Sequence, residues 1–98
     1  MKLFSWSQEK NDWLEMHRGV CFEDILFALE NGSLLDHGMH PNQQRYPGQK
    51  IMVVEVNQYA YLVPYVETED EIFLKTIIPS RKASRDHLGD RGAVDGAQ

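Results

Sequence analysis

Apolar residues recur at helical spacing in the first third of the chain and at alternate positions in its second half. The stretch "SWSQEKNDWLEMHR" predicts a helix over residues 7–18 in which Trp13 and Met16 share one face. Gly19 ends that helix, and "CFEDILFALENG" predicts a second helix over residues 22–30. We expect both helices to pack on a sheet formed by the rest of the chain.

The alternating pattern begins at Lys50 and predicts an antiparallel meander of three strands. A short strand over residues 33–36 and a loop rich in Gly and Pro precede the meander. Its strands are residues 50–56, 59–66 and 71–79, joined by two-residue turns at 57–58 and 68–69. Pro64 has no N–H to donate to a ladder, which predicts a bulge or an unpaired edge position there.

Counting across these turns assigns the side chains to the two faces of the sheet. The face against the helices carries Met52, Val54, Val56, Tyr59, Tyr61, Val63, Tyr65, Ile72, Leu74, Thr76 and Ile78. We expect Trp13 to be buried against this face. The opposite face, which includes Phe73, Lys75 and Ile77, is expected to be partly covered.

After Pro79, Ser80 precedes a mixed-charge stretch that predicts a C-terminal helix. The pattern as a whole predicts an α+β fold: two N-terminal helices packed on an antiparallel sheet of three to four strands, then a short C-terminal helix. The chain has 98 residues and 42% hydrophobic content, which predicts a single domain over residues 1–88. Residues 89–98 have no apolar period and predict a flexible tail.

The net charge of −5 argues against a general nucleic-acid binder, because nonspecific affinity depends on cations that displace phosphate counterions. Five of the ten basic residues nevertheless lie within residues 75–91, which leaves room for a local basic site. No apolar stretch approaches the ~20 residues of a membrane span, and the first residues lack the apolar centre of a secretory signal. We therefore expect a cytoplasmic protein with no membrane partner.

Two other groups of reactive side chains offer little chemistry. The single cysteine, Cys21, has no His or Asp directly beside it, so we expect it to fill the core rather than act as a nucleophile. The stretch "DHGMH" offers Asp36, His37 and His40, but no second cluster of Cys or His completes a metal site. We expect neither a metal nor another cofactor.

Arg81 and Lys82 stand in the first turn of the predicted C-terminal helix, where the backbone dipole disfavours cations. Either the fold tolerates two solvated cations at a cost of roughly 0.3–1 kcal/mol each, or an anion such as a phosphate binds there. Arg85 lies one helical turn after Arg81 on the same face, so the two arginines could clamp one phosphate.

Two stretches resemble the BrnT-type toxins of type II toxin–antitoxin systems, which belong to the RelE/ParE-like superfamily. They are "FSWSQEKNDWLEMHRGVCFED" and "IIPSRKASRDHL". The matching residues are Phe4, Trp6, Lys10, Asn11, Gly19, Val20, Phe22 and Glu23 in the first stretch, and Ser80, Arg81, Lys82, Ala83 and Ser84 in the second. The middle of the chain departs from the BrnT pattern, which leaves no role assigned to Arg45 or the 37–49 loop.

The resemblance implies a RelE-like fold and a bacterial toxin that acts as a ribonuclease on messenger RNA, free or bound to the ribosome. It also implies a small DNA-binding antitoxin whose binding blocks that activity. The competing interpretation, which the acidic net charge favours, is a noncatalytic protein-binding module with the same fold.

Cleavage of RNA without a metal needs a group that takes the 2′-hydroxyl proton, cations that stabilise the charged phosphorus centre, and a proton donor for the leaving oxygen. The candidate catalytic residues are Lys75, Arg81, Lys82, Arg85 and His87. The cations supply charge, while His87, His17 or a tyrosine exchanges protons. We expect the site to lie between Lys75 on the sheet and the start of the last helix.

Overall fold

The computed structural model describes residues 2–97, with side chains placed for residues 2–89, as an α+β domain. Its elements in chain order are β1 (Leu3–Ser5), α1 (Gln8–Arg18), α2 (Phe22–Glu30), β2 (Leu34–Met39), β3 (Lys50–Val56), β4 (Tyr59–Glu67), β5 (Glu71–Leu74), β6 (Ile78–Pro79) and α3 (Arg81–Ala97). The α+β class agrees with the sequence prediction. The flexible tail predicted for residues 89–98 falls almost entirely outside the described side chains and stays a prediction.

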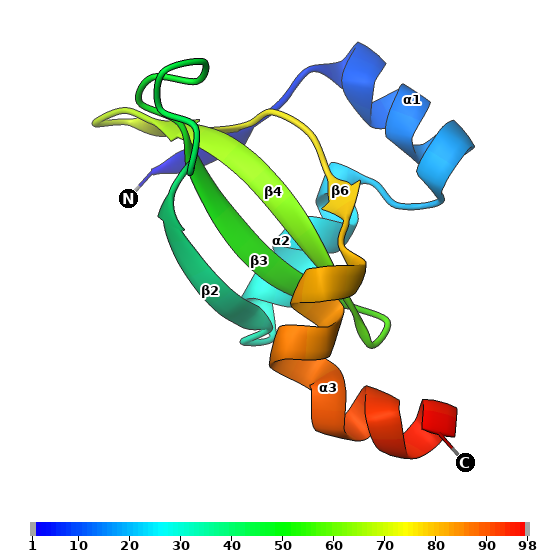
Figure 1. The fold of residues 1–98 in the computed structure, drawn as a ribbon. Helices are drawn as coiled ribbons and strands as arrows, with labels where there is room; N and C mark the ends of the chain where they lie inside the picture. The colour runs from blue at the N-terminus through cyan, green and yellow to red at the C-terminus, as the bar shows by residue number, and fades with distance from the viewer. Residues whose placement is uncertain (1, 98) are drawn as a thin grey trace.

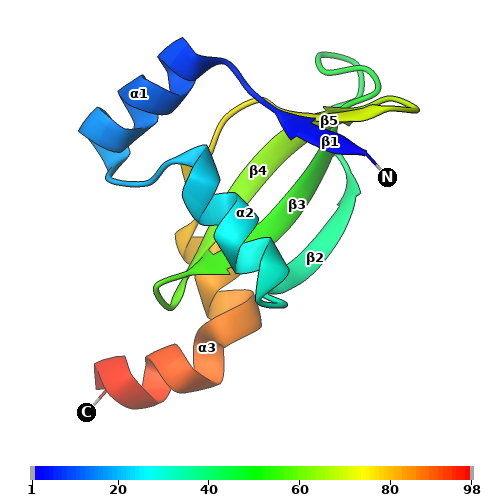
Figure 2. The same cartoon turned by 180° about the vertical axis from the view of Figure 1, so that it is seen from behind.

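A single mixed sheet separates the helices into two layers. The strand order is β1-β5-β4-β3-β2, and β6 pairs with β4 beyond the end of β5. Figure 1 shows α3 and β6 on the near face of the sheet, and Figure 2 shows α2 across the opposite face, with α1 beyond the end of the strands. Among residues 2–97, no helix is long and apolar enough to cross a membrane.

The two N-terminal helices begin and end close to the predicted positions. The Ser7 hydroxyl accepts the backbone N–H of Lys10 at 3.2 Å and caps α1, and Gly19 ends it with φ at 69°. The second helix spans Phe22–Glu30, as predicted. Helical spacing and capping residues were sufficient to place both elements.

Asn11 joins the two helices and is the one buried polar side chain among residues 2–89. Its Oδ1 accepts the N–H of Phe22 at 2.7 Å, and its Nδ2 donates to Glu23 Oε1 at 2.8 Å. This hydrogen bond lowers the pKa of Glu23 from its ordinary value. Because Phe22 is fully buried, the hydrogen bond that its N–H donates to Asn11 also fixes where α2 enters the core.

The β3–β4 hairpin has the predicted two-residue turn, in which Asn57 and Gln58 both adopt positive φ. The predicted face assignment is confirmed for β3, β4 and β5, whose apolar side chains meet the helices. The core on the α2 side consists of Leu14, Val20, Phe22, Ile25, Ala28, Met52, Val54, Val63, Tyr65, Leu74 and Ile77. A smaller cluster on the α3 side contains Val53, Ala60, Ala83 and Leu88.

The predicted strand over residues 71–79 is wrong, because the chain leaves the ladder between Leu74 and Ile78. Tyr65 pairs with Leu74, whereas Leu62 pairs with Ile78, so the register changes by one residue at Pro64. Pro64 accepts the N–H of Lys75 at 2.8 Å but cannot return a bond. The break reverses the predicted faces, and Ile77 is fully buried while Ile78 is 39% exposed.

Three further predictions about the sheet need correction. The turn between β4 and β5 lies at residues 69–70 instead of 68–69, since Glu67 pairs with Ile72 and the N–H of Thr68 donates to the carbonyl of Glu71. The register differs by two residues from the predicted one, which keeps the same faces. The strand predicted at 33–36 extends to Met39 because Gly38 pairs with Ile51. Within residues 2–97 the sheet has six strands instead of three to four, since β1 adds to β5 in parallel and the last predicted strand divides in two.

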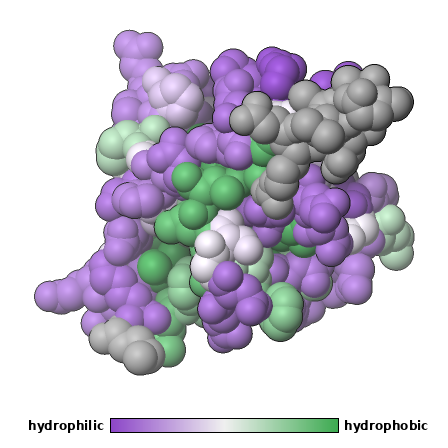
Figure 3. Space-filling view, turned by 90° about the horizontal axis from the view of Figure 1, so that it is seen from below, coloured by the Kyte–Doolittle hydropathy of each residue, from purple (hydrophilic) through white to green (hydrophobic). Residues whose placement is uncertain are grey.

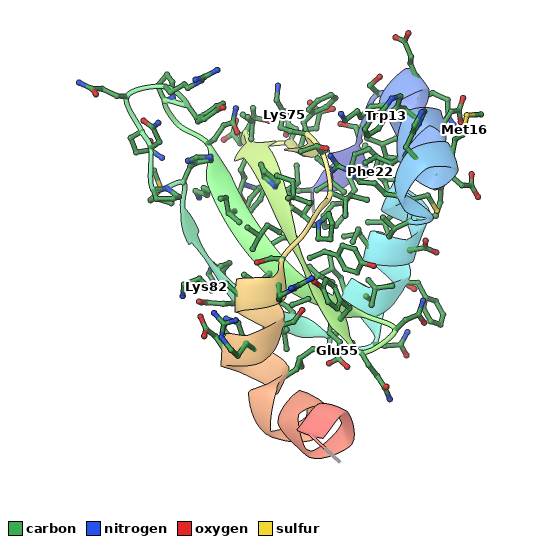
Figure 4. The ribbon with its side chains drawn as sticks, turned by 45° about the vertical axis from the view of Figure 1, so that its right-hand side comes forward. Trp13, Met16, Phe22, Glu55, Lys75 and Lys82 are labelled. Atoms are coloured by element: carbon green, nitrogen blue, oxygen red, sulfur yellow. The ribbon has the colours of Figure 1, made fainter. Side chains whose placement is uncertain are left out.

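The expectation that Trp13 is buried is also wrong. Trp13 is 41% exposed and Met16 is 81% exposed, so the face of α1 that they share looks away from the core. In Figure 4, Met16 points outward from α1, whereas Phe22 lies between the helices and the sheet. Leu14 provides the main buried side chain of α1.

These exposures predict that two substitutions on α1 change the free energy of unfolding by very different amounts. Leu14→Ala should lower the free energy of unfolding by about 2–5 kcal/mol, because it opens a cavity in the core. Met16→Ala should change it by less than about 0.5 kcal/mol. Urea unfolding followed by circular dichroism measures both, and equal losses for the two variants would contradict the placement of α1.

Candidate functional site

The start of α3 is held rigidly against β4 by a short network of hydrogen bonds. Ser80 caps the helix, since its hydroxyl accepts the N–H of Ala83 at 3.0 Å. The N–H of Ser80 donates to the carbonyl of Ala60 at 3.1 Å, and the N–H of Ala60 donates to Ser84 Oγ at 2.8 Å. The first turn of α3 therefore has a fixed position on the sheet.

This anchored turn exposes its basic side chains. Ala83 and Leu88 are buried against the sheet, while Arg81, Lys82 and Arg85 are exposed. Neither arginine forms an ion pair with a side chain of residues 2–89. The arginine pair, Arg81 and Arg85, is thus available to an anion from solution.

Lys82 differs from the two arginines because it is paired within the helix. Its Nζ lies 2.8 Å from Asp86 Oδ2, and both side chains are largely exposed. The hydrogen bond from Lys82 lowers the pKa of Asp86, with smaller contributions from the charges of Arg85 and His87. An anion that binds Lys82 must compete with this carboxylate.

Lys75 does not join the basic residues of α3. Its ammonium lies 5.4 Å from the ring centroid of Phe73, and the side chain is exposed. In Figure 4, Lys75 stands near the top of the molecule and Lys82 well below it at the start of α3. Along β4, the N–H of Lys75 donates to the carbonyl of Pro64 and the N–H of Ser80 to that of Ala60, so Lys75 and the helix start are four positions apart. The expected single site between them stays a prediction.

The groups proposed to exchange protons are also scattered. His87 is exposed and follows Arg85 by two residues, a spacing at which side chains on a helix do not face each other. The Nδ1 of His17 donates to the carbonyl of Trp13 at 3.0 Å on α1. Tyr65 is buried, and this burial raises the pKa of its phenol. Of these groups, only His87 lies on α3 together with the arginine pair.

The sequence interpretation missed a second group of basic side chains, which surrounds Trp13. Lys10 Nζ lies 4.6 Å from the centroid of the indole, and Arg18 Cζ lies 5.1 Å from it. The ring of His17 stacks on the indole at 4.6 Å with an interplanar angle of 20°. The spacing of Lys10 and His17 around Trp13 could have indicated this cluster, because residues three and four apart are neighbours on a helix.

Cys21, Arg45 and the histidine loop carry no reactive arrangement in the structure. Burial raises the pKa of the Cys21 thiol to about 11, which disfavours a thiolate nucleophile. Arg45 is exposed and its guanidinium lies 5.6 Å from the Tyr46 ring. Within the described part of the chain, no three His, Cys, Asp or Glu side chains are grouped to hold a metal ion.

Two larger hollows lie away from both groups of basic side chains. A cleft of about 750 Å³ between α2 and the β3–β4 turn is lined by residues that include Asp24, Phe27 and Glu55. A groove of about 470 Å³ near β2 is lined by residues that include Leu34, Met52 and Tyr65. Figure 3 shows hydrophobic groups gathered in the middle of the face seen from below.

Comparison with protein-family models, with curated proteins and with solved structures found no match to this chain.

The Lys82–Asp86 pair yields a titration prediction. Replacing Lys82 with Gln removes the hydrogen bond that lowers the Asp86 pKa, so this carboxyl should titrate at higher pH in the variant than in the wild type. Carbon-detected NMR of the side-chain carboxyl across the acid range measures the difference. Arg81→Gln is the matched control and should leave the Asp86 pKa nearly unchanged.

Proposed function

We propose that the protein is the toxin of a toxin–antitoxin pair: an endoribonuclease that cleaves messenger RNA without a metal and is neutralised by a small DNA-binding antitoxin. The observation that carries the proposal is the arginine pair, Arg81 and Arg85, exposed on a helix start that is fixed to the sheet. These residues belong to the stretch that resembles the end of BrnT-type toxins. The same resemblance supports a RelE-like fold as part of the proposal.

The arginine pair suits a phosphodiester because a guanidinium offers several donors in a planar array and remains charged at every relevant pH. When the 2′-oxygen attacks the adjacent phosphorus, negative charge builds on the phosphoryl oxygens, and two arginines one turn apart can stabilise it. In this reaction the 2′-hydroxyl loses its proton to a base as its oxygen bonds to phosphorus. The bond from phosphorus to the 5′-oxygen breaks and that oxygen gains a proton, which leaves a 2′,3′-cyclic phosphate and a 5′-hydroxyl. Fixing the helix start lowers the entropic cost of holding these cations in place.

The remaining candidates have narrower roles in this proposal. Lys75 stands four positions along β4 from the start of α3, so in this proposal it contacts another part of the same RNA strand. Lys82 contributes less than the arginines, since Asp86 already neutralises it. His87 can exchange protons with water or with the RNA only if the strand follows the surface of α3.

The noncatalytic protein-binding module is the second candidate, and the scattering of proton-exchanging groups favours it. A fold that kept the cationic helix start but not an acid–base pair would bind an anionic partner without cleaving it. Both candidates use the arginine pair, so binding alone does not separate them. Cleavage does.

The toxin proposal predicts that the purified protein cleaves messenger RNA in the presence of EDTA, with ribosomes, without them or in both conditions. The double variant Arg81→Gln/Arg85→Gln should lose cleavage by at least about 100-fold, because it removes the charge that stabilises the transition state. Its melting temperature should stay within a degree or two of the wild type, since both side chains are exposed. Gel analysis of a defined transcript and a thermal melt provide the two readouts.

Lys82→Gln is the matched control on the same helix turn and should reduce cleavage far less than the double variant. A folded wild-type protein that leaves the transcript intact with and without ribosomes would contradict the toxin proposal and favour the binding module. Full cleavage by the folded double variant would show that the arginine pair has no part in the reaction.

A further inference from the structure

Trp13 is exposed at the surface although tryptophan is buried on average. It keeps 41% of its surface accessible, on a helix whose Leu14 already supplies the contact with the core. The fold therefore gains little from an indole at this position. An exposed tryptophan with cations around it is typical of a surface that binds another molecule.

The groups around the indole favour an aromatic, anionic ligand. Lys10 and Arg18 lie within 5.1 Å of the ring centroid, and His17 stacks on the ring nearly in parallel. Arg18 is also held in place, because its Nη1 donates to the carbonyl of Ile77. A ligand at this position would meet a preformed aromatic stack and a positioned guanidinium rather than mobile side chains.

A cleft of about 280 Å³ opens beside the indole and is lined by Ser7, Glu9, Lys10 and Trp13. Part of the indole surface is therefore open to a planar group. The carboxylate of Glu9 can accept an N–H from the edge of a nucleobase, and the hydroxyl of Ser7 can donate as well as accept. These polar groups stand beside the stacking surface, as they do in sites that read single-stranded RNA.

We propose that this cleft binds one unpaired nucleobase of single-stranded RNA, stacked on Trp13, with Lys10 and Arg18 near the flanking phosphates. The inference rests on the proposed RNA substrate and adds a second contact to the arginine pair of α3. An acidic peptide fits less well: its carboxylates could pair with Lys10 and Arg18, but nothing in it would use the exposed indole. A base uses both the ring and the cations.

The test is a titration of the full-length protein into a fluorescein-labelled, unstructured 2′-O-methyl RNA of about twelve nucleotides, within the usual range of single-strand site sizes. The 2′-O-methyl group prevents attack by the 2′-oxygen, so binding is measured without cleavage. Fluorescence anisotropy at several salt concentrations gives the Kd and its salt dependence.

Trp13→Ala should weaken binding about 5- to 100-fold, the usual effect of losing one stacked base, and should leave the salt slope unchanged. Trp13→Phe should retain most of the affinity, which also covers the case in which the alanine variant fails to fold. Lys10→Gln should reduce the salt slope by about one. Met16→Ala is the matched control, since Met16 is exposed on the same helix but does not line the cleft.

Equal affinity of the folded Trp13→Ala variant and the wild type would overturn the inference and leave the proposed ribonuclease untouched. Binding that depends on Trp13 in a protein that never cleaves RNA would support the base site and contradict the catalytic function. Tighter binding of poly-glutamate than of RNA, with the same dependence on Trp13, would assign the surface to an acidic protein partner instead. No binding of RNA by the wild type would overturn the base site, whereas the cleavage assay with ribosomes decides on the ribonuclease separately.

Discussion

The missing N–H of Pro64 determines how the second half of the structure is arranged. At Pro64 the central strand β4 cannot bond in both directions to its neighbour, so the chain leaves the ladder after Leu74 and returns one residue out of register at Ile78. The segment between Leu74 and Ile78 turns Ile77 into the core, while Lys75 is exposed.

The segment between Leu74 and Ile78 also connects the surface of α1 with the sheet. The carbonyl of Ile77 accepts a hydrogen bond from Arg18, and Arg18 in turn lies over the indole of Trp13. After this segment, β6 leads directly into Ser80, whose hydrogen bonds fix the start of α3 on Ala60. The two surfaces proposed to contact RNA are therefore both positioned by the segment between Leu74 and Ser80.

Much of the fold follows from local signals that act over a few residues. Ser7 and Gly19 define α1, the positive φ angles of Asn57 and Gln58 form the hairpin turn, and alternation assigns the faces of β3 to β5. The faces beyond Leu74 could not be predicted, because the register change depends on pairing between strands and not on the pattern within one. No local pattern predicts β1, which has three residues and pairs in parallel with a distant strand. The sequence indicated a basic group at the start of α3, and the structure shows these side chains exposed. Their position relative to Lys75 and the exposure of Trp13 depend on tertiary packing.

The central claim is that RNA contacts this protein on two surfaces, the Trp13 side of α1 and the start of α3. Amide NMR spectra recorded while an uncleavable single-stranded RNA is added to isotope-labelled protein test it most directly. The account predicts shifts concentrated in residues 7–18 and 80–86, with little change around Phe27 and the β3–β4 turn. Shifts confined to the cleft between α2 and that turn, or to the groove near β2, would contradict it.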